Sequence, residues 1–594
     1  MILILGGTTE GRLAARVADE AGSRFYYSTK GALQSLTCQH GVQLTGGMDD
    51  SQMKQFCEQQ AIRLLVDAAH PFATQLHRTV AETAQALRLP VVRVERIYPE
   101  RSGRIVWCRD YPDAIRQLEA RGVERLLALT GVQTLAKLRP FWERHTCWFR
   151  ILPREESLRL ARSTGFDESH LLYDQEVDEE TLYRQIAPDA ILTKESGLSG
   201  GFQQKVEAAE RLGIPVFAIC RPSLPDCFIP VTGEHGLRKQ IEKWVPDFFP
   251  LRSGFTTGAC ATAAAKAALC ALLGQGEFST VPITLPDGET LSLPVASVQV
   301  ESSTSATAVV VKDAGDDPDV TQGRSIVATV RLLDEPGIRF CRGEGVGEVT
   351  LPGLGLPLGE PAINRVPREM MTRELSALTR QGVEVTISVP GGEELARRTF
   401  NPKLGIVGGI SIIGTSGIVR PFSHEAFVQA IRKEIEVSQA LGVPRLVLNS
   451  GAKSEQQLKN RYPDLPPQAF VHFGNYIGEA LQQAHALGVR CVTLGIMLGK
   501  AVKLAEGHLD THSKKVVMNK QFLHEVAEAA GCSSETHVVI DRIVWAKELW
   551  SALPTTDAER FFEAIRLRCY QQVRKCFPDG ELMLCLLQEN GSSS

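Results

Sequence analysis

A glycine-rich turn near the start of the chain has the residue types and spacing of a phosphate site. Gly6-Gly7-Thr8-Thr9-Glu10-Gly11 follows the apolar run Ile2–Leu5 and opens a helical pattern over Gly11–Ala21. Backbone N–H groups at such a helix start hold phosphate when no bulky side chain blocks them. Thr8 replaces the middle glycine of the dinucleotide fingerprint, so the turn fits either a dinucleotide or simply a tight connection.

The end of the next expected strand, Phe25–Thr29, bears on the choice of cofactor. NAD-binding chains place an acidic residue about 20 residues after the turn. Ser28, Thr29 and Lys30 stand there instead. Hydroxyls and a lysine suit a 2′-phosphate, which favours NADPH over NADH, although Lys30 also fits a solvated loop position.

Polar residues follow three more apolar runs in the first 245 residues, at Asp67–Ala73, Thr130–Thr134 and Thr193–Gly197. Ligands of open α/β sheets bind beyond the carboxyl ends of the strands. The three clusters therefore predict a cleft between two lobes. A lone histidine is often structural, so His70 gains its functional interpretation from this company.

In the second half, Gly, Thr and Asp gather in four segments: Gly254–Gly258, Lys312–Thr321, Gly343–Gly347 and Asn401–Gly417. The last is expected to be a strand ending in Gly414-Thr415-Ser416-Gly417 beside a helix start, which suits a nucleoside ligand or a tight turn. The four aspartates from 313 to 319 lack the order of an EF-hand and fit turn chemistry. His508 and His512 have the i, i+4 spacing of a zinc pair without the glutamate of a zinc protease motif, so no metal ligand is assigned.

These residues must be positioned by about three to five domains, given 594 residues. Strands alternate with helical patterns up to about residue 245, which predicts an α/β class with two Rossmann-like lobes, about 1–123 and 124–247. Two prolines and a change of composition mark a seam from Val245 to Ser253. Domains 1–247 and 252–594 are expected, the second with an α+β subdomain (about 252–400) and a smaller α/β subdomain (about 401–594).

Composition restricts the partners. A hydrophobic fraction of 43% and a charged fraction of 23% are typical of soluble globular proteins. The net charge of -4 favours neither nucleic acid nor a membrane surface. The 14 cysteines form no CxxC pair and are expected to be reduced thiols in the cytoplasm. A homo-oligomer is compatible with the sequence.

The strings GGTTEG, DAAHPFA, LTGVQTL and TKESG together resemble the precorrin-6A reductase family, including its cobalt-precorrin form, over about residues 1–245. The resemblance implies hydride transfer from NADPH or NADH to a tetrapyrrole held between two lobes, with Gly6 to Gly11 and Ser28 at the cofactor. The implied cleft residues are Asp67, His70, Arg93, Thr130, Gly131, Lys194, Glu195 and Ser196. Because the substrate bears many carboxylates, Arg93, Arg150, Lys194 and Arg221 are expected to pair with them. No catalytic acid or base is assigned.

The strings SGFTTGACATAAAKAAL, KDAGDDPDVT, GEGVGEVTLPGL, NPKLGIVGGISIIGTSGIVRP and GKAVKLAEGHLDTH resemble the cobalt-precorrin-5B C1-methyltransferase family over about residues 252–590. The resemblance implies methylation of the ring-contracted macrocycle at C1 by S-adenosylmethionine. No standard methyltransferase glycine motif is present. Cofactor contacts are expected at Gly414, Thr415 and Ser416, and substrate contacts at Thr256, Thr257, Lys312, Asp313, Lys503 and His508.

Together the halves predict a bifunctional enzyme of cobalamin ring synthesis that acts on cobalt-tetrapyrrole intermediates. It would methylate cobalt-precorrin-5B to cobalt-precorrin-6A and reduce cobalt-precorrin-6A to cobalt-precorrin-6B. One alternative is a tetrapyrrole carrier with a single active half, and another is a generic NADPH oxidoreductase fused to an unassigned domain. Complete motifs in both halves favour the bifunctional enzyme.

Overall fold

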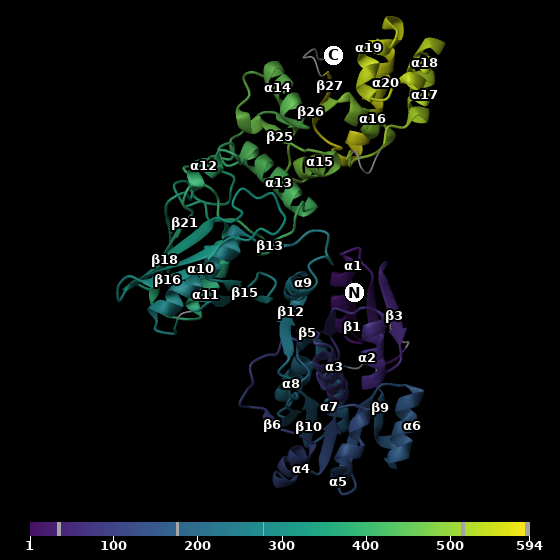
Figure 1. Ribbon diagram of the computed structural model, residues 1–594, viewed down its shortest axis with the longest axis vertical. Helices are drawn as coiled ribbons and strands as arrows, with labels where there is room; N and C mark the ends of the chain where they lie inside the picture. Colours follow the sequence, from purple (N-terminus) through teal and green to yellow (C-terminus); the bar gives the residue numbers. More distant parts are fainter. Residues whose placement is uncertain (32–36, 174–177, 277, 513–516, 589–594) are drawn as a thin grey trace. The chain divides into compact units, whose positions relative to one another are not determined.

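The computed structural model describes residues 1–31, 37–173, 178–276, 278–512 and 517–588. The chain forms two compact units, Met1–Pro250 and Leu251–Ser594 (Figure 1). The division falls inside the stretch from Val245 to Ser253 where the composition changes. Separate clusters of buried apolar side chains lie in each unit, so each has a core of its own.

The first lobe of the N-terminal unit is a six-stranded parallel sheet in the order β12-β5-β4-β1-β2-β3. Its elements are β1 Ile2–Leu5, α1 Thr9–Asp19, β2 Phe25–Thr29, β3 Gly41–Thr45, α2 Asp50–Gln59, β4 Leu64–Asp67, α3 Thr74–Leu87, β5 Val91–Glu95, β12 Phe228–Thr232 and α9 Gly233–Trp244. Ile2 and Ile4 pack toward α1 and α9. Leu3 and Leu5 pack toward α2 and α3, because successive strand residues point to opposite faces.

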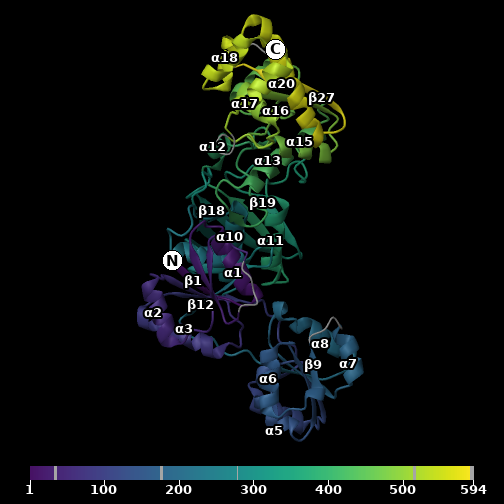
Figure 2. The ribbon, with the colours of Figure 1, turned by 90° about the vertical axis from the view of Figure 1, so that its right-hand side faces the viewer.

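The second lobe is another six-stranded parallel sheet, in the order β6-β11-β10-β7-β8-β9. Its elements are β6 Val106–Cys108, α4 Tyr111–Ala120, β7 Arg125–Ala128, η1 Val132–Thr134, η2 Ala136–Leu138, α5 Arg139–Trp142, β8 Thr146–Ile151, α6 Glu155–Thr164, η3 Glu168–His170, β9 Leu171–Tyr173, α7 Glu179–Ile186, β10 Ala190–Lys194, η4 Leu198–Gly200, α8 Phe202–Arg211 and β11 Val216–Ile219. Helices α4 and α6 cover one face and α7 and α8 the other. Figure 2 shows β1, α1 and α2 of the first lobe in purple and α6, α7 and β9 of the second in blue.

The predicted parallel sheets are confirmed, but the predicted lobe boundary at residues 123 and 124 is wrong. The chain enters the second sheet already at β6 and returns to the first at β12. Strand β6 has three residues, two of them half-buried, so its sequence pattern does not distinguish it from a loop. The terminal strand and helix of the unit therefore belong to the first lobe.

The C-terminal unit begins with a subdomain built on the mixed sheet β16-β17-β18-β21-β19. Its elements are β13 Gly254–Phe255, α10 Thr257–Leu272, β14 Thr280–Thr284, β15 Thr290–Pro294, β16 Ser297–Val300, β17 Ser305–Val311, β18 Ser325–Leu333, β19 Ile338–Arg342, β20 Glu348–Val349, α11 Arg365–Ser376, β21 Gly382–Ser388, α12 Gly392–Ala396, β22 Ile406–Val407 and β23 Ile418–Val419. The alanine-rich helix α10 is buried between this sheet and α11, where its small side chains permit close packing. Strands β16 and β17 pair antiparallel within the Val-, Ser- and Thr-rich stretch Ser297–Val311.

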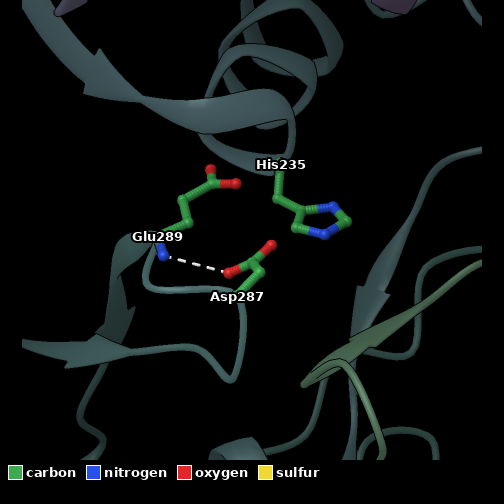
Figure 3. A group of neighbouring side chains, drawn as sticks. All are labelled: His235, Asp287 and Glu289. Atoms are coloured by element: carbon green, nitrogen blue, oxygen red, sulfur yellow. Dashed lines mark hydrogen bonds between the residues drawn. The ribbon is translucent and has the colours of Figure 1, made fainter. Parts of the chain in front are cut away.

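The β14–β15 hairpin is closed by its own turn residues. The Asp287 carboxylate accepts a hydrogen bond from the Glu289 backbone N–H at 2.9 Å (Figure 3). The Leu285 N–H donates to the Glu289 carbonyl at 2.7 Å. His235, also labelled in Figure 3, belongs to α9 of the N-terminal unit.

The second subdomain of the C-terminal unit is a four-stranded parallel sheet in the order β25-β24-β26-β27. Its elements are α13 His424–Ala440, β24 Leu446–Asn449, α14 Ala452–Arg461, η5 Pro467–Ala469, β25 Phe470–His472, α15 Ile477–Ala486, β26 Cys491–Met497, α16 Leu498–Glu506, α17 Lys520–Ala529, α18 Ser534–Arg542, η6 Ala546–Glu548, α19 Leu549–Ala552, α20 Thr555–Cys576 and β27 Glu581–Leu587. Among the described residues, no helix combines the length and the apolar character that crossing a membrane requires.

The predicted subdomain boundary at residues 400 and 401 is also wrong. Strands β22 and β23 pair with β20 and β13 of the first subdomain, and Ile412 enters its core. The second subdomain starts at α13. Lys403 ties the two together, because its ammonium bonds to the Glu434 carboxylate of α13 and to the Phe470 carbonyl.

Candidate functional sites

The β1–α1 turn is held by bonds that its own residues make. The Thr8 hydroxyl caps α1 by accepting from the Gly11 N–H at 3.0 Å, and it donates to the Ala68 carbonyl at 2.6 Å. A Cβ added to Gly6 would lie 2.4 Å from the Tyr27 ring, so packing requires this glycine. Gly7, with φ +98°, is exposed, and a Cβ there would meet no atom within 4 Å. Gly7 therefore borders open space at the turn.

Glu10 is turned toward the second lobe. Its carboxylate accepts from the Ser199 hydroxyl and pairs with the Arg96 guanidinium at 3.1 Å. Burial raises the pKa of this carboxyl, but the Ser199 bond and the charge of Arg96 together hold its pKa below the ordinary value. This carboxylate already has two partners inside the protein, and the predicted contact of Glu10 with the cofactor stays a prediction.

Arg96 joins the first and last motifs of the N-terminal unit. Its guanidinium donates to the Ser196 carbonyl at 2.7 Å. A Cβ on Gly197 or Gly200 would lie 2.9 Å from Arg96 atoms, so both glycines make room for this side chain. Arg96 is not among the predicted residues, although it directly follows β5 and so occupies a strand-end position, as His70 does.

His70 and Lys194 lie in the same neighbourhood, and both have strongly shifted pKa values. Burial, reinforced by the charges of Arg96 and Lys194, lowers the pKa of His70 to about 4. Its Nδ1 accepts from the Phe72 N–H at 3.2 Å, which places the proton of the neutral ring on Nε2. Burial, followed by the charges of Lys137 and Lys205, lowers the pKa of Lys194 to about 8. The Lys194 ammonium lies 5.4 Å from the Phe72 ring centroid and has no carboxylate partner among the described residues.

Two predicted cleft residues instead close a buried network. The Asp67 carboxylate bonds to Arg93 at 2.9 Å, to His77 at 2.6 Å and to the Ala69 N–H at 3.0 Å. Arg93 also donates to Glu95 at 2.7 Å, and neither Asp67 nor Arg93 is exposed. Each of these charges has a partner inside the protein, and the predicted contacts of Asp67 and Arg93 with substrate stay predictions.

The other predicted residues of this unit differ in their availability. Arg150 makes two bonds to Glu179, the shorter at 2.8 Å, and its expected pairing with substrate stays a prediction. Glu195 accepts from Arg101 at 2.9 Å and from the Arg221 N–H at 2.9 Å. Arg221 is exposed, and its guanidinium lies 3.6 Å from the Tyr98 ring centroid. Ser28, Thr130 and Ser196 are buried, Gly131 is half-buried, and Thr9 and Lys30 are exposed.

In the C-terminal unit, three of the four predicted segments meet at the start of α10. The Phe255 N–H donates to the Asp313 carbonyl at 2.7 Å, which joins the first segment to the second. The Thr256 N–H donates to the Gly417 carbonyl at 3.0 Å and the Gly258 N–H to the Ile413 carbonyl at 2.9 Å, which adds the fourth. The Gly414–Gly417 loop thus lies beside the start of α10.

The two threonines of this junction hold the loop. Thr256 caps α10 by accepting from the Ala259 N–H at 3.1 Å, and the Thr257 hydroxyl accepts from the Ile413 N–H at 2.9 Å. Both residues are buried, and their predicted contact with substrate stays a prediction. Thr415 and Ser416 are exposed at the tip of the loop, and their predicted contact with the cofactor stays a prediction.

Thr257→Val is expected to lower the free energy of unfolding of the C-terminal unit by about 0.5–1.5 kcal/mol, because the Ile413 N–H and the Ser411 carbonyl lose their hydrogen bonds to the hydroxyl. Thr415→Val, at the exposed tip, serves as the matched control. Chemical denaturation of both full-length variants measures the difference. Equal stability of the two would show that the Thr257 hydroxyl does not hold the loop.

Lys312 is a structural residue of the second segment. It is buried, and its ammonium bonds to the Asp319 carboxylate and, at 2.7 Å, to the Thr321 hydroxyl. Although burial raises the pKa of the Asp319 carboxyl, the Lys312 charge and the bonds it receives hold that pKa below its ordinary value. The Lys312 ammonium already has a counter-charge, and its predicted contact with substrate stays a prediction.

The aspartates of the second segment face separate partners. Asp313 accepts from the Gly315 N–H at 2.9 Å and Asp316 from the Arg252 N–H at 2.7 Å. Asp317 accepts from the Phe422 N–H at 3.1 Å. Each carboxylate stabilises a different piece of backbone, which is the turn chemistry that the sequence left open beside a metal site.

Basic residues gather beyond the carboxyl ends of β25 and β26. The Lys500 ammonium bonds to the Gly474 carbonyl, and Lys503 donates to the Thr511 carbonyl at 3.3 Å. Burial, with the charge of Lys503, lowers the pKa of Lys500 to about 8, and burial lowers that of Lys503. His508 is half-buried, 3.6 Å from the Glu506 carboxylate. Neither lysine has a carboxylate partner in the described part of the chain, so the pair suits an anionic ligand. Lys503 is among the predicted substrate contacts, whereas Lys500, one helical turn away, is not.

Comparisons with known proteins agree with this division. Residues 1–243 match the family model described as precorrin-6x reductase CbiJ/CobK, and residues 246–421 match the model described as CbiD. The cobalt-precorrin-5B C(1)-methyltransferase of Prosthecochloris aestuarii is 45% identical over 346 residues, which are 57% of this chain and 94% of the relative. That of Geobacillus kaustophilus is 43% identical over 324 residues, 54% of this chain and 87% of the relative. A solved structure titled CobK precorrin-6A reductase is 22% identical, with a TM-score of 0.34, and the match covers 41% of this chain and 96% of that one.

Proposed function

The chain belongs to the cobalt-precorrin-5B C(1)-methyltransferase family through its C-terminal unit and carries a precorrin-6x reductase domain in its N-terminal unit, and we propose that it catalyses both reactions. The C-terminal unit methylates cobalt-precorrin-5B at C1, and the N-terminal unit reduces the resulting cobalt-precorrin-6A. The supporting observation is that two family matches occupy the two compact units and together cover most of one chain. The order of the units is opposite to the order of the reactions.

We infer that the reductase uses Lys194 as its proton donor. Reduction of a ring double bond needs a hydride on one carbon and a proton on its neighbour. A reduced nicotinamide, when bound, supplies the hydride. Lys194 is half-buried at the end of β10 and has no carboxylate partner in the described part of the chain. Its pKa of about 8 keeps it protonated yet acidic near neutral pH. The neutral His70 beside it offers an Nε2–H that can orient the substrate.

The residues near the β1–α1 turn fit NADPH in part. Gly7 borders open space at the turn, and the exposed Lys30 follows β2, where it suits a 2′-phosphate. Thr8 and Glu10 are engaged elsewhere, so contacts to the pyrophosphate are assigned to Gly7 and the exposed Thr9. For S-adenosylmethionine, the exposed hydroxyls of Thr415 and Ser416 supply polar groups beside α10.

Purified full-length protein given cobalt-precorrin-5B and methyl-labelled S-adenosylmethionine is expected to yield labelled cobalt-precorrin-6A. NADPH added next should then be oxidised in proportion to that product. Labelled product without oxidation would leave a methyltransferase joined to an inactive reductase. Absence of both, with tight binding of the macrocycle, would instead support a carrier.

Separating the units at Pro250 is expected to slow the coupled two-step reaction without slowing either single step. Fusion keeps the intermediate near the second active site, which raises its effective concentration. The measurement is the lag before NADPH oxidation, with the separated units mixed at equal concentration. An unchanged lag would remove any kinetic role for the fusion.

A further inference from the structure

Phe422 combines two features that are unfavourable for a large apolar residue: high exposure and a left-handed backbone conformation. Its side chain is 71% exposed, so it gains little from burial. Its backbone has φ +54°, a left-handed conformation that a bulky L residue rarely adopts. Strain of this kind persists where the surroundings impose it, and it is concentrated at sites of function. The position therefore calls for a role outside the core.

The surroundings that impose this conformation are two of the segments that define the C-terminal unit. The Asp317 carboxylate accepts from the Phe422 N–H at 3.1 Å. Phe422 follows β23, which pairs with β13 directly before α10. The next residue, Ser423, caps α13 by accepting from the Ala426 N–H at 3.2 Å. The ring is thus presented from a fixed point between the two subdomains of this unit.

Contacts from the start of α13 lead to the basic residues of the second subdomain. The His424 ring packs edge-on against Tyr476, with 4.7 Å between centroids. Tyr476 forms an antiparallel bridge with Asp510, and Lys503 donates to the carbonyl of the next residue, Thr511. The backbone from Phe422 to His424, together with the contacts of Tyr476, therefore connects this position to the segment that Lys503 contacts.

We propose that the Phe422 ring stacks on the face of the macrocyclic substrate, while the Lys500–Lys503 pair binds carboxylates at its edge; this inference rests on the proposed methyltransferase function. A conjugated macrocycle has broad apolar faces and an anionic rim. The exposed Phe422 ring suits the face, and Lys500 and Lys503, which have no carboxylate partner among the described residues, suit the rim. The adenine of S-adenosylmethionine is the other flat ring in the reaction. A ring that is 71% exposed fits a ligand lying across an open surface better than a nucleoside enclosed in a pocket.

The test measures binding of each ligand separately. Full-length Phe422→Ala is expected to bind cobalt-precorrin-5B about tenfold more weakly in an absorbance titration without S-adenosylmethionine. Its affinity for labelled S-adenosylmethionine, measured by equilibrium dialysis, should stay unchanged. Phe422→Trp, which keeps an aromatic face, should restore macrocycle binding. Trp545→Ala, which removes a side chain that is 66% exposed elsewhere in the same unit, is the matched control and should change neither affinity.

Phe422→Gly separates backbone strain from the ring. Glycine adopts φ +54° without steric cost, so this variant should unfold at a higher temperature than Phe422→Ala while binding the macrocycle equally weakly. Wild-type affinity in either Phe422→Gly or Phe422→Ala would overturn the inference, and so would a loss of S-adenosylmethionine affinity in place of macrocycle affinity. Wild-type protein that binds both ligands but transfers no methyl group would instead refute the proposed function.

Discussion

Replacing Lys194 by methionine is expected to lower the rate of cobalt-precorrin-6A reduction about a hundredfold or more, because a general acid contributes roughly 10²–10⁴-fold. Methyl transfer by the same chain should be unchanged, since Lys194 belongs to the N-terminal unit and the methyltransferase motifs to the other. The two rates are measured on one preparation, so unaltered methyl transfer also reports that the variant is folded.

The pH dependence of the reductase carries the same information. Lys194 must be protonated to donate, so the rate should fall as the pH rises above about 8, the pKa of this group. Lys137 is an exposed lysine whose charge helps to lower that pKa. Lys137→Met removes the repulsion and should therefore move the falling limb of the profile to higher pH.

Lys194→Arg distinguishes proton donation from charge. Arginine keeps the positive charge but stays protonated throughout the accessible pH range, so it cannot deliver the proton. A variant with near-normal KM and a kcat as low as that of Lys194→Met supports the acid. If Lys194→Arg keeps full kcat, Lys194 only binds a carboxylate of the substrate and the proton comes from water.

The residues placed at strand ends could be predicted from sequence. His70 follows β4 of the first sheet and Lys194 ends β10 of the second, so the strand-end position of each follows from the pattern. Their neighbourhood does not, because it depends on the packing of the two lobes. The strand-end rule would also have found Arg96. The pairing of Arg96 with Glu10 could not be predicted, because it joins a residue after β5 to a residue of α1, two segments of the first lobe that lie far apart in the sequence.

The burial and the backbone conformation of a residue could not be predicted from its motif. Lys312 and Lys503 have the same residue type and both stand in dense motifs, yet one is buried against Asp319 and the other has no carboxylate partner among the described residues. Asp67 and Arg93 likewise satisfy each other inside the protein. Residue type indicates what a side chain can bind, but the fold decides whether a partner from the same chain already binds it. Phe422 was missed because exposure and a positive φ leave no mark in a hydrophobic pattern.

Asp319→Asn is expected to destabilise the C-terminal unit by about 3 kcal/mol, because it leaves the buried Lys312 ammonium without its counter-charge. If Lys312 bound substrate, as its motif suggested, the same change would affect KM and leave stability intact. Denaturant unfolding of the full-length variants separates these outcomes. In the double variant with Lys312→Met, no unpaired charge remains, so the loss should be smaller than the sum of the single losses.

Acid unfolding tests the same ion pair from the other partner. The folded-state pKa of Asp319 is lower than its unfolded value, so the carboxylate contributes its full stability above the unfolded pKa of about 4. That contribution is lost as the pH falls below this value and through the folded pKa. The stability difference between wild type and Asp319→Asn should therefore be constant near neutral pH and shrink on acidification. A difference that persists undiminished at low pH would show that the carboxylate charge does not stabilise the loop and would favour Lys312 as a substrate contact.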